Sequence, residues 1–275
     1  MPRSLRDSNS SSKKIIVYAV IGIIAVASVT VFVFARQPLA DTNNEEEALQ
    51  KFQNLFCGPD ARPNSNAYIT EFVLSFECEM PVGMAVEGGQ VWYVSAKRGL
   101  LGNYNSEENK FSTYNIPEWP SREQPFTAIP SWSMSWTVKI DDNGNVWFTD
   151  QNDAIWRFNK TSKSFDMFKV PASYPSAMDF DAEGNIYFIG ISSESLYFGD
   201  VSKMKGGTSE GIIEIPLPLD GFSGINLRQV DSGALVVDNT RNDVWVSLLA
   251  FERKGQIFQY DIDTSKVVRI VNLPP

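Results

Sequence analysis

The sequence predicts an all-β protein folded as a β-propeller, and three observations lead to this prediction. A short strand with an aromatic residue at a fixed position occurs four times, at Trp92, Trp147, Tyr187 and Trp245. A strand ending in an acid and a turn precede each copy, and two more strands follow it. Four short strands per unit, joined by hairpin turns, are the composition of a propeller blade.

The strands can be placed in order within each unit. The first strands are expected at 84–87, 138–141, 178–181 and 235–238, and the second at 91–94, 146–149, 186–189 and 244–247. The third are expected at 101–104, 155–158, 196–198 and 257–260, and the fourth at 111–116, 165–170, 212–215 and 267–273. Between the first two strands, Gly88-Gly89, Asn143-Gly144 and Glu183-Gly184-Asn185 supply residues that tolerate positive φ in a tight hairpin.

The spacing of the units is irregular. The aromatic positions are 55, 40 and 58 residues apart (92 to 147, 147 to 187, 187 to 245), so the longer steps leave room for inserted loops. Core anchors of a β-sandwich are the alternative, but four copies in one register favour blades. Four repeats are visible, and they could be part of a six- or seven-bladed array.

The N-terminal region predicts a membrane anchor. Residues 15–34 run for twenty residues without a charge, which is enough for a transmembrane helix; a cleaved signal peptide is the alternative. Residues 1–14 carry Arg3, Arg6, Lys13 and Lys14 against Asp7, a charge of about +3. By the positive-inside rule, this tail is cytoplasmic and the rest of the chain lies outside the cell membrane.

The region beyond the expected helix is acidic. The whole chain carries a net charge of −9, so removal of the tail's +3 leaves about −12 for the remainder. A domain of this charge without a basic stripe is not expected to bind nucleic acid. The domain boundaries that follow are a tether at 35–66 and a propeller at 67–275.

The chain has two cysteines and no histidine. Cys57 and Cys78 are 21 residues apart in a region expected outside the membrane, where a disulfide is plausible; two buried free thiols are the alternative. Two thiols are too few for a metal site, and no histidine exists to complete one. Residues 68–76 are expected to form a strand that closes the last blade.

Two kinds of segment are candidates for a ligand-binding face. The insert at 119–136 holds three tryptophans and three prolines, and it either covers a binding face, with Trp132 as the ligand contact, or simply covers the core. Polar loop residues after the second strands are the other kind, and they could surround a Ca²⁺ or Mg²⁺ ion or form a solvated rim. Together with Tyr174, these candidates are Asp150, Asn152 and Glu194.

The stretch at 141–171 resembles the repeat of the virginiamycin B lyase (streptogramin lyase) family of β-propellers. The similarity lies in DDNGNVWFT, IWRFN and the closing strand before Pro171, with weaker copies at 87–95, 181–190 and 238–247. The resemblance implies six or seven blades, and a catalytic histidine with a Mg²⁺-binding acidic partner. This sequence shows four units and no histidine, so no catalytic residue can be carried over.

Two functions follow as hypotheses. The first is a binding module at the cell surface, whose partner is a small molecule, a glycan or a protein. The second is a metal-dependent lyase or lactonase of the streptogramin lyase and gluconolactonase-like propellers. The absence of histidine favours the first, because histidine is the commonest general base at neutral pH.

Overall fold

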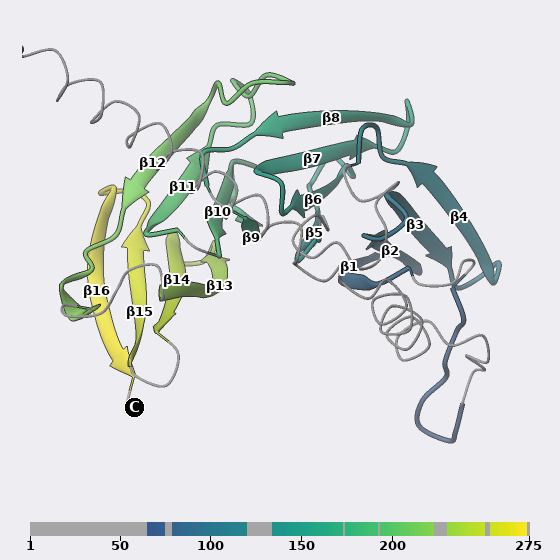
Figure 1. The fold of residues 1–275 in the computed structure, drawn as a ribbon, viewed down its shortest axis with the longest axis horizontal. Coiled ribbons are helices and arrows are strands. Elements are labelled where there is room, and N and C mark those ends of the chain that lie inside the picture. Colours follow the sequence, from purple (N-terminus) through teal and green to yellow (C-terminus); the bar gives the residue numbers. More distant parts are fainter. Residues whose placement is uncertain are drawn as a thin grey trace, which may run out of the picture. The chain divides into compact units, whose positions relative to one another are not determined.

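The computed structural model describes residues 65–74, 79–119, 134–172, 174–191, 193–222, 230–250 and 254–273. This part of the chain forms four four-stranded antiparallel sheets, each made of four consecutive strands. Figure 1 shows the sheets following one another in chain order, from the blue strands of the first to the yellow strands of the last. The expected all-β architecture of four repeated units is confirmed.

The strand bounds agree closely with those expected. Sheet 1 contains β1 (Pro81–Glu87), β2 (Gln90–Ser95), β3 (Leu100–Asn105) and β4 (Lys110–Asn115). Sheet 2 contains β5 (Val138–Ile140), β6 (Val146–Asp150), β7 (Ala154–Asn159) and β8 (Ser164–Lys169). Sheet 3 contains β9 (Pro175–Phe180), β10 (Ile186–Gly190), β11 (Ser195–Gly199) and β12 (Ile212–Pro216), followed by a 3₁₀ turn at Asp220–Phe222. Sheet 4 contains β13 (Val230–Asp238), β14 (Asp243–Ala250), β15 (Lys254–Asp261) and β16 (Lys266–Leu273).

The turn between β5 and β6 shows why the repeated sequence folds locally. Gly144 has a φ of 76°, the left-handed conformation that glycine adopts without steric cost. The Asp141 carboxylate accepts the backbone N–H groups of Asn143 and Asn145, at 3.0 and 2.8 Å, and the indole N–H of Trp147 at 2.8 Å. One carboxylate therefore fixes both the turn and the aromatic residue of the following strand.

The hydrophobic core lies between the sheets. Within the described ranges, buried residues form three clusters, and each joins one sheet to the next in the chain. The first strands of sheets 2, 3 and 4 each contact the first or second strand of the sheet before. Sheets 2 and 3, the central sheets, each pack against another sheet on both faces. Both faces of these two sheets are therefore apolar.

Two predictions concern the N-terminal part of the chain: a closing strand at 68–76 and a membrane span at 15–34. Residues 68–74 are not a strand, so the predicted closing strand is wrong over that range; Phe72 instead packs on Tyr104 of β3 with a ring separation of 4.8 Å. Residues 75 and 76 lie outside the described residues. Among the residues that are described, no helix is long and apolar enough for a membrane span, and the expected span at 15–34 lies outside them.

Candidate functional site

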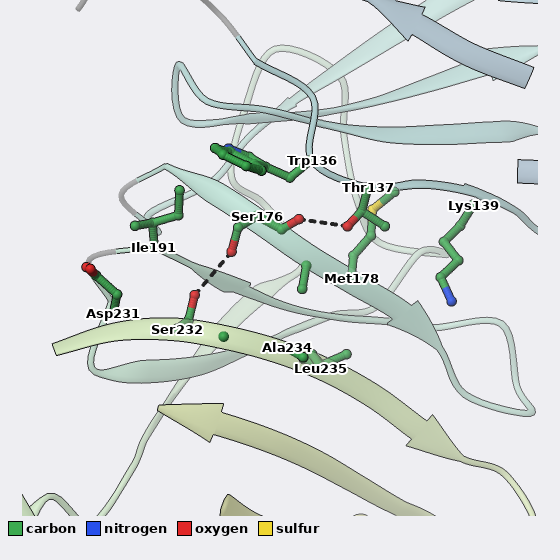
Figure 2. A pocket seen from close by; sticks show the side chains of 12 residues that line it. Trp136, Thr137, Lys139, Ser176, Met178, Ile191, Asp231, Ser232, Ala234 and Leu235 are labelled. Carbon is green, nitrogen blue, oxygen red and sulfur yellow. Dashed lines mark hydrogen bonds between the residues drawn. The ribbon is translucent and has the colours of Figure 1, made fainter. Parts of the chain in front are cut away.

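A cavity of about 490 Å³ crosses the first strands of three successive sheets. Its lining comes from β5 and the two residues before it, from β9, and from the first half of β13 (Figure 2). Apolar side chains make up much of the wall, with a few polar groups among them. This mixture is typical of sites that bind small molecules. We call this cavity the inner-strand pocket.

Trp136 forms one wall of the inner-strand pocket and is 39% exposed. Its backbone is held firmly, because the buried Thr149 hydroxyl accepts the N–H groups of both Trp136 and Thr137, at 3.1 and 3.2 Å. Gly83 of β1 packs against the same backbone, and a Cβ there would lie only 2.9 Å from the Trp136 carbonyl oxygen. The backbone from which the indole projects is therefore held in place.

Hydroxyl groups line the opposite wall. Ser176 and Ser232 share a hydrogen bond of 3.1 Å between β9 and β13, and the Thr137 hydroxyl donates to the Ser176 carbonyl at 2.7 Å (Figure 2). These bonds link sheets 2, 3 and 4 along this wall of the pocket. A hydroxyl group can both donate and accept a hydrogen bond. These neutral groups can therefore bind a polar ligand that is a donor or an acceptor.

The charged groups of this pocket lie near its ends. Lys139 pairs with Asp179 at 2.9 Å, and the second Asp179 oxygen accepts the Val237 N–H at 3.1 Å. Asp179 itself does not line the pocket, and the acid in the lining is Asp231. The lysine is thus neutralised by a carboxylate that also ties sheet 3 to sheets 2 and 4. The geometry suits a neutral ligand better than an ionic one.

A second cavity of about 300 Å³ lies beside the turn between β6 and β7 and contains two of the predicted site residues. Asp150 is buried, and its carboxylate accepts the Asn152 N–H at 2.9 Å and the Trp156 indole N–H at 3.0 Å. The structure therefore brings Asp150 and Asn152 together. Their mutual bonds shape the turn, as the equivalent bonds of Asp141 do in the preceding one.

Tyr174 and Glu194, the next two predicted residues, lie on either side of β9 and β10. Tyr174 is exposed and has a φ of 53°; its N–H donates to Asp153 at 3.2 Å. Glu194 is exposed, and its backbone carbonyl accepts the Leu217 N–H at 3.2 Å. None of these four residues lines the inner-strand pocket. Their role in binding stays a prediction.

Three further predicted residues lie outside the described part of the chain: Trp132, Cys57 and Cys78. The two described ends of the tryptophan-rich insert differ in role. Trp119 is buried in the core and donates its indole N–H to the Ala96 carbonyl at 2.6 Å, whereas Trp136 faces the inner-strand pocket. The described start of the insert covers the core and its described end lines a cavity, and a ligand-binding role of the insert stays a prediction.

The described residues do not provide the ligand set of a divalent-cation site. No three acidic, cysteine or histidine side chains gather anywhere in that part of the chain. Ca²⁺ and Mg²⁺ sites in proteins are usually built from several carboxylate and carbonyl oxygens. The Mg²⁺ that the family resemblance implies therefore has no fitting site among these residues.

Sequence reasoning missed Ser176, Ser232 and Lys139, which carry the polar chemistry of the inner-strand pocket. They lie on the first strands, whereas the loops after the second strands were the predicted location. A signal was available in the repeat itself. Lys139 and Asp179 occupy the same position in successive first strands, where opposite charges would meet if the sheets packed side by side.

Comparisons with known proteins show the fold. No family model matches the chain, and no curated protein matches it in sequence. Among solved structures, virginiamycin B lyase from Staphylococcus aureus matches at 18% identity and a TM-score of 0.50, over 71% of this chain and 55% of that one. The sheets are propeller blades. A streptogramin B lyase matches at 18% identity and a TM-score of 0.52, over 74% of this chain and 57% of that one.

The same fold occurs in proteins of unlike function. Hydrazine synthase of Kuenenia stuttgartiensis matches at 10% identity and a TM-score of 0.55, over 75% of this chain and 53% of that chain. The present chain therefore spans little more than half the length of each of these structures. Because propellers host many activities, the fold alone does not assign one.

Proposed function

We propose that this protein is a membrane-anchored, extracytoplasmic propeller that binds a small neutral ligand, such as a sugar unit of a glycan, in the inner-strand pocket. The observation that carries the proposal is the partly exposed Trp136, whose backbone is held in place, in one cavity of about 490 Å³ with the hydroxyl groups of Ser176 and Ser232. An indole offers a large apolar face at low conformational cost. The anchor rests on the twenty uncharged residues at 15–34.

The composition of the pocket supports a neutral partner. Lys139 is paired with Asp179, so an anion would have to compete with a carboxylate already in place. A sugar has an apolar face and several hydroxyls, which match the indole on one wall and Ser176 and Ser232 on the other. The hydroxyl groups on that wall can exchange their hydrogen bonds to each other for hydrogen bonds to such a ligand.

The test is binding of the full-length protein, in a mild detergent, to an array of neutral glycans. We expect Trp136→Ala to reduce binding of the captured glycan at least tenfold, since loss of one buried aromatic contact typically costs about 2 kcal/mol or more. Tyr68→Ala is the matched control, because Tyr68 is an almost fully exposed aromatic residue outside the pocket. Equal loss in both variants, or binding unchanged in Trp136→Ala, would count against the pocket.

A lyase is the second candidate, favoured by the structural likeness to streptogramin lyases. One of the similar structures is a catalytically inactive virginiamycin B lyase from Staphylococcus aureus with quinupristin, at 18% identity and a TM-score of 0.53, over 74% of this chain and 58% of that one. The direct assay is incubation of this protein with quinupristin and Mg²⁺, with and without a chelator, followed by chromatography. Chelator-sensitive product formation would establish the lyase and displace the binding module.

A further inference from the structure

The turn that joins the third strand to the fourth begins with an equivalent residue in each sheet. This residue lies two positions beyond the third-strand partner of the repeat's aromatic residue, and in the four sheets it is Asn105, Asn159, Asp200 and Asp261. In every case its side-chain oxygen accepts backbone N–H groups two or three residues further on. Because the turn uses only this oxygen, aspartate serves it as well as asparagine does.

The turn of sheet 2 differs from the other three in its chemistry. It reads Asn159-Lys160-Thr161, with an amide at the first position, a hydroxyl at the third and no proline between them. This pattern is the acceptor sequence for N-linked glycans in exported domains. In sheet 1 the third position is Glu107, and the turns of sheets 3 and 4 begin with an aspartate, which has no amide nitrogen. Only one of the four equivalent turns can therefore be an acceptor.

The reactive groups of this turn are accessible. Both hydrogen bonds of the Asn159 side chain use Oδ1, at 2.9 Å each, and Nδ2 has no hydrogen bond within the described ranges. Thr161 is exposed, and its hydroxyl lies at the tip of the hairpin. Lys160, the residue between them, pairs with Glu87 of sheet 1, and its ammonium lies 5.5 Å from the ring centre of Trp92. The fold therefore holds the middle side chain and leaves the amide nitrogen free to react.

We propose that Asn159 is a modification site that carries an N-linked glycan; this rests on the extracytoplasmic location in the proposed function. The donor is a glycan joined to a polyprenyl phosphate or pyrophosphate in the membrane, and a membrane-bound glycan transferase catalyses the step. A bond forms between Nδ2 of Asn159 and C1 of the first sugar, while the bond between C1 and the phosphate oxygen breaks. The amide loses one proton, the lipid phosphate leaves, and no oxidant or reductant is needed.

The modified turn and Trp136 lie at opposite ends of sheet 2. Lys160 lies beside the β5–β6 turn, since its ammonium nitrogen would be 3.8 Å from a Cβ at Gly144. Trp136 and Thr137, which line the inner-strand pocket, instead precede the start of β5. A glycan attached at Asn159 is therefore remote from the indole, and we expect its loss to leave ligand binding unchanged.

The test is mass spectrometry of peptides from the full chain, purified from the membranes of its own cells. We expect the wild-type peptide to carry the added mass of a glycan on Asn159. Thr161→Ala should lose this mass completely, whereas Thr161→Ser should keep it, because serine also supplies the hydroxyl. Both variants change an exposed side chain, so the fold is expected to be the same in each.

Sheet 1 offers a matched control, because Asn105 makes the same turn contacts without a hydroxyl two residues on. Glu107→Thr supplies that hydroxyl and should add a second glycan, on Asn105. The chain has one other acceptor sequence, Asn9-Ser10-Ser11, in the tail that is expected to be cytoplasmic. We expect Asn9 to stay unmodified in every variant.

An Asn159 without a glycan, or a glycan that persists in Thr161→Ala, would overturn the proposal. Labelling of lysines on intact cells with a membrane-impermeant reagent separates this failure from a failure of the proposed location. A propeller that is labelled but carries no glycan is extracytoplasmic, and only the modification is then wrong. A propeller that stays unlabelled, together with a glycan on Asn9, would reverse the topology and overturn both proposals.

Discussion

The two central sheets and the two end sheets share one sequence pattern but differ in environment. Trp147 of sheet 2 is fully buried, stacks on Phe168 at 5.5 Å and meets Phe180 of sheet 3. Trp245 of sheet 4 occupies the same register position, paired with Val236, which is half exposed. The repeated motif therefore predicts on which face of its sheet a side chain lies. How much that side chain stabilises the fold depends on whether another sheet packs on that face.

The largest expected effect compares these two tryptophans. Trp147→Ala removes a buried ring, its bond to Asp141 and its stacking on Phe168, and should lower the free energy of unfolding by about 3–5 kcal/mol. Trp245→Ala should cost only about 1–2 kcal/mol, because part of that ring is already in contact with water. Urea unfolding of the full chain in a mild detergent, followed by circular dichroism, measures both. Equal costs for the two variants would contradict the difference between central and end sheets.

The strands were predictable because period-two patterns and turn residues act locally. Asp141, Gly144 and Trp147 specify a turn, and the hydrogen bonds of the Asp141 carboxylate all lie within seven residues. The closing strand at 68–76 was predicted from its likeness to the fourth strand of sheet 2, but strand formation also requires a partner edge. In the described range 68–74, Phe72 packs on the face of sheet 1 instead.

The site was less predictable because it depends on contacts between sheets. Ser176 and Ser232 are 56 residues apart, and nothing in their local sequence distinguishes them from solvated serines. Asp150, by contrast, looked like a ligand on account of its loop position. Its carboxylate bonds to Asn152 and Trp156, which are turn contacts that the corresponding Asp141 could have suggested.

A smaller effect is expected at the charged position of the first strands. Asp179→Ala removes the ion pair with Lys139 and leaves the Val237 N–H without its carboxylate acceptor, so we expect a loss of about 1–3 kcal/mol. Val236 occupies the same register position in sheet 4, and Val236→Ala should cost less than about 0.5 kcal/mol because Val236 is half exposed. Urea unfolding of the two variants measures this difference, and a larger loss at Val236 would reverse the order that burial predicts.

The smallest effect is expected in the hairpin turns, where central and end sheets should behave alike. A hydrogen bond from Lys203, supported by Ser202, lowers the pKa of Asp200 in sheet 3, and the backbone N–H of Thr264 lowers the pKa of Asp261 in sheet 4. A lowered pKa in the folded state stabilises the fold above the ordinary aspartate pKa of about 3.9, and this stabilisation is lost as the pH falls through the folded value.

We therefore expect the urea midpoint to fall below about pH 4, and Asp200→Asn and Asp261→Asn each to weaken that acid dependence to a similar, small extent. In both turns hydrogen bonds, and not burial, are the main cause of the lowered pKa, so we expect the neighbouring sheet to change the effect little. Urea midpoints of the wild type and the two variants, measured from pH 2 to pH 7, would show whether the two effects are similar. A much stronger acid dependence at Asp200 than at Asp261 would mean that the packing of the central sheets extends into their turns.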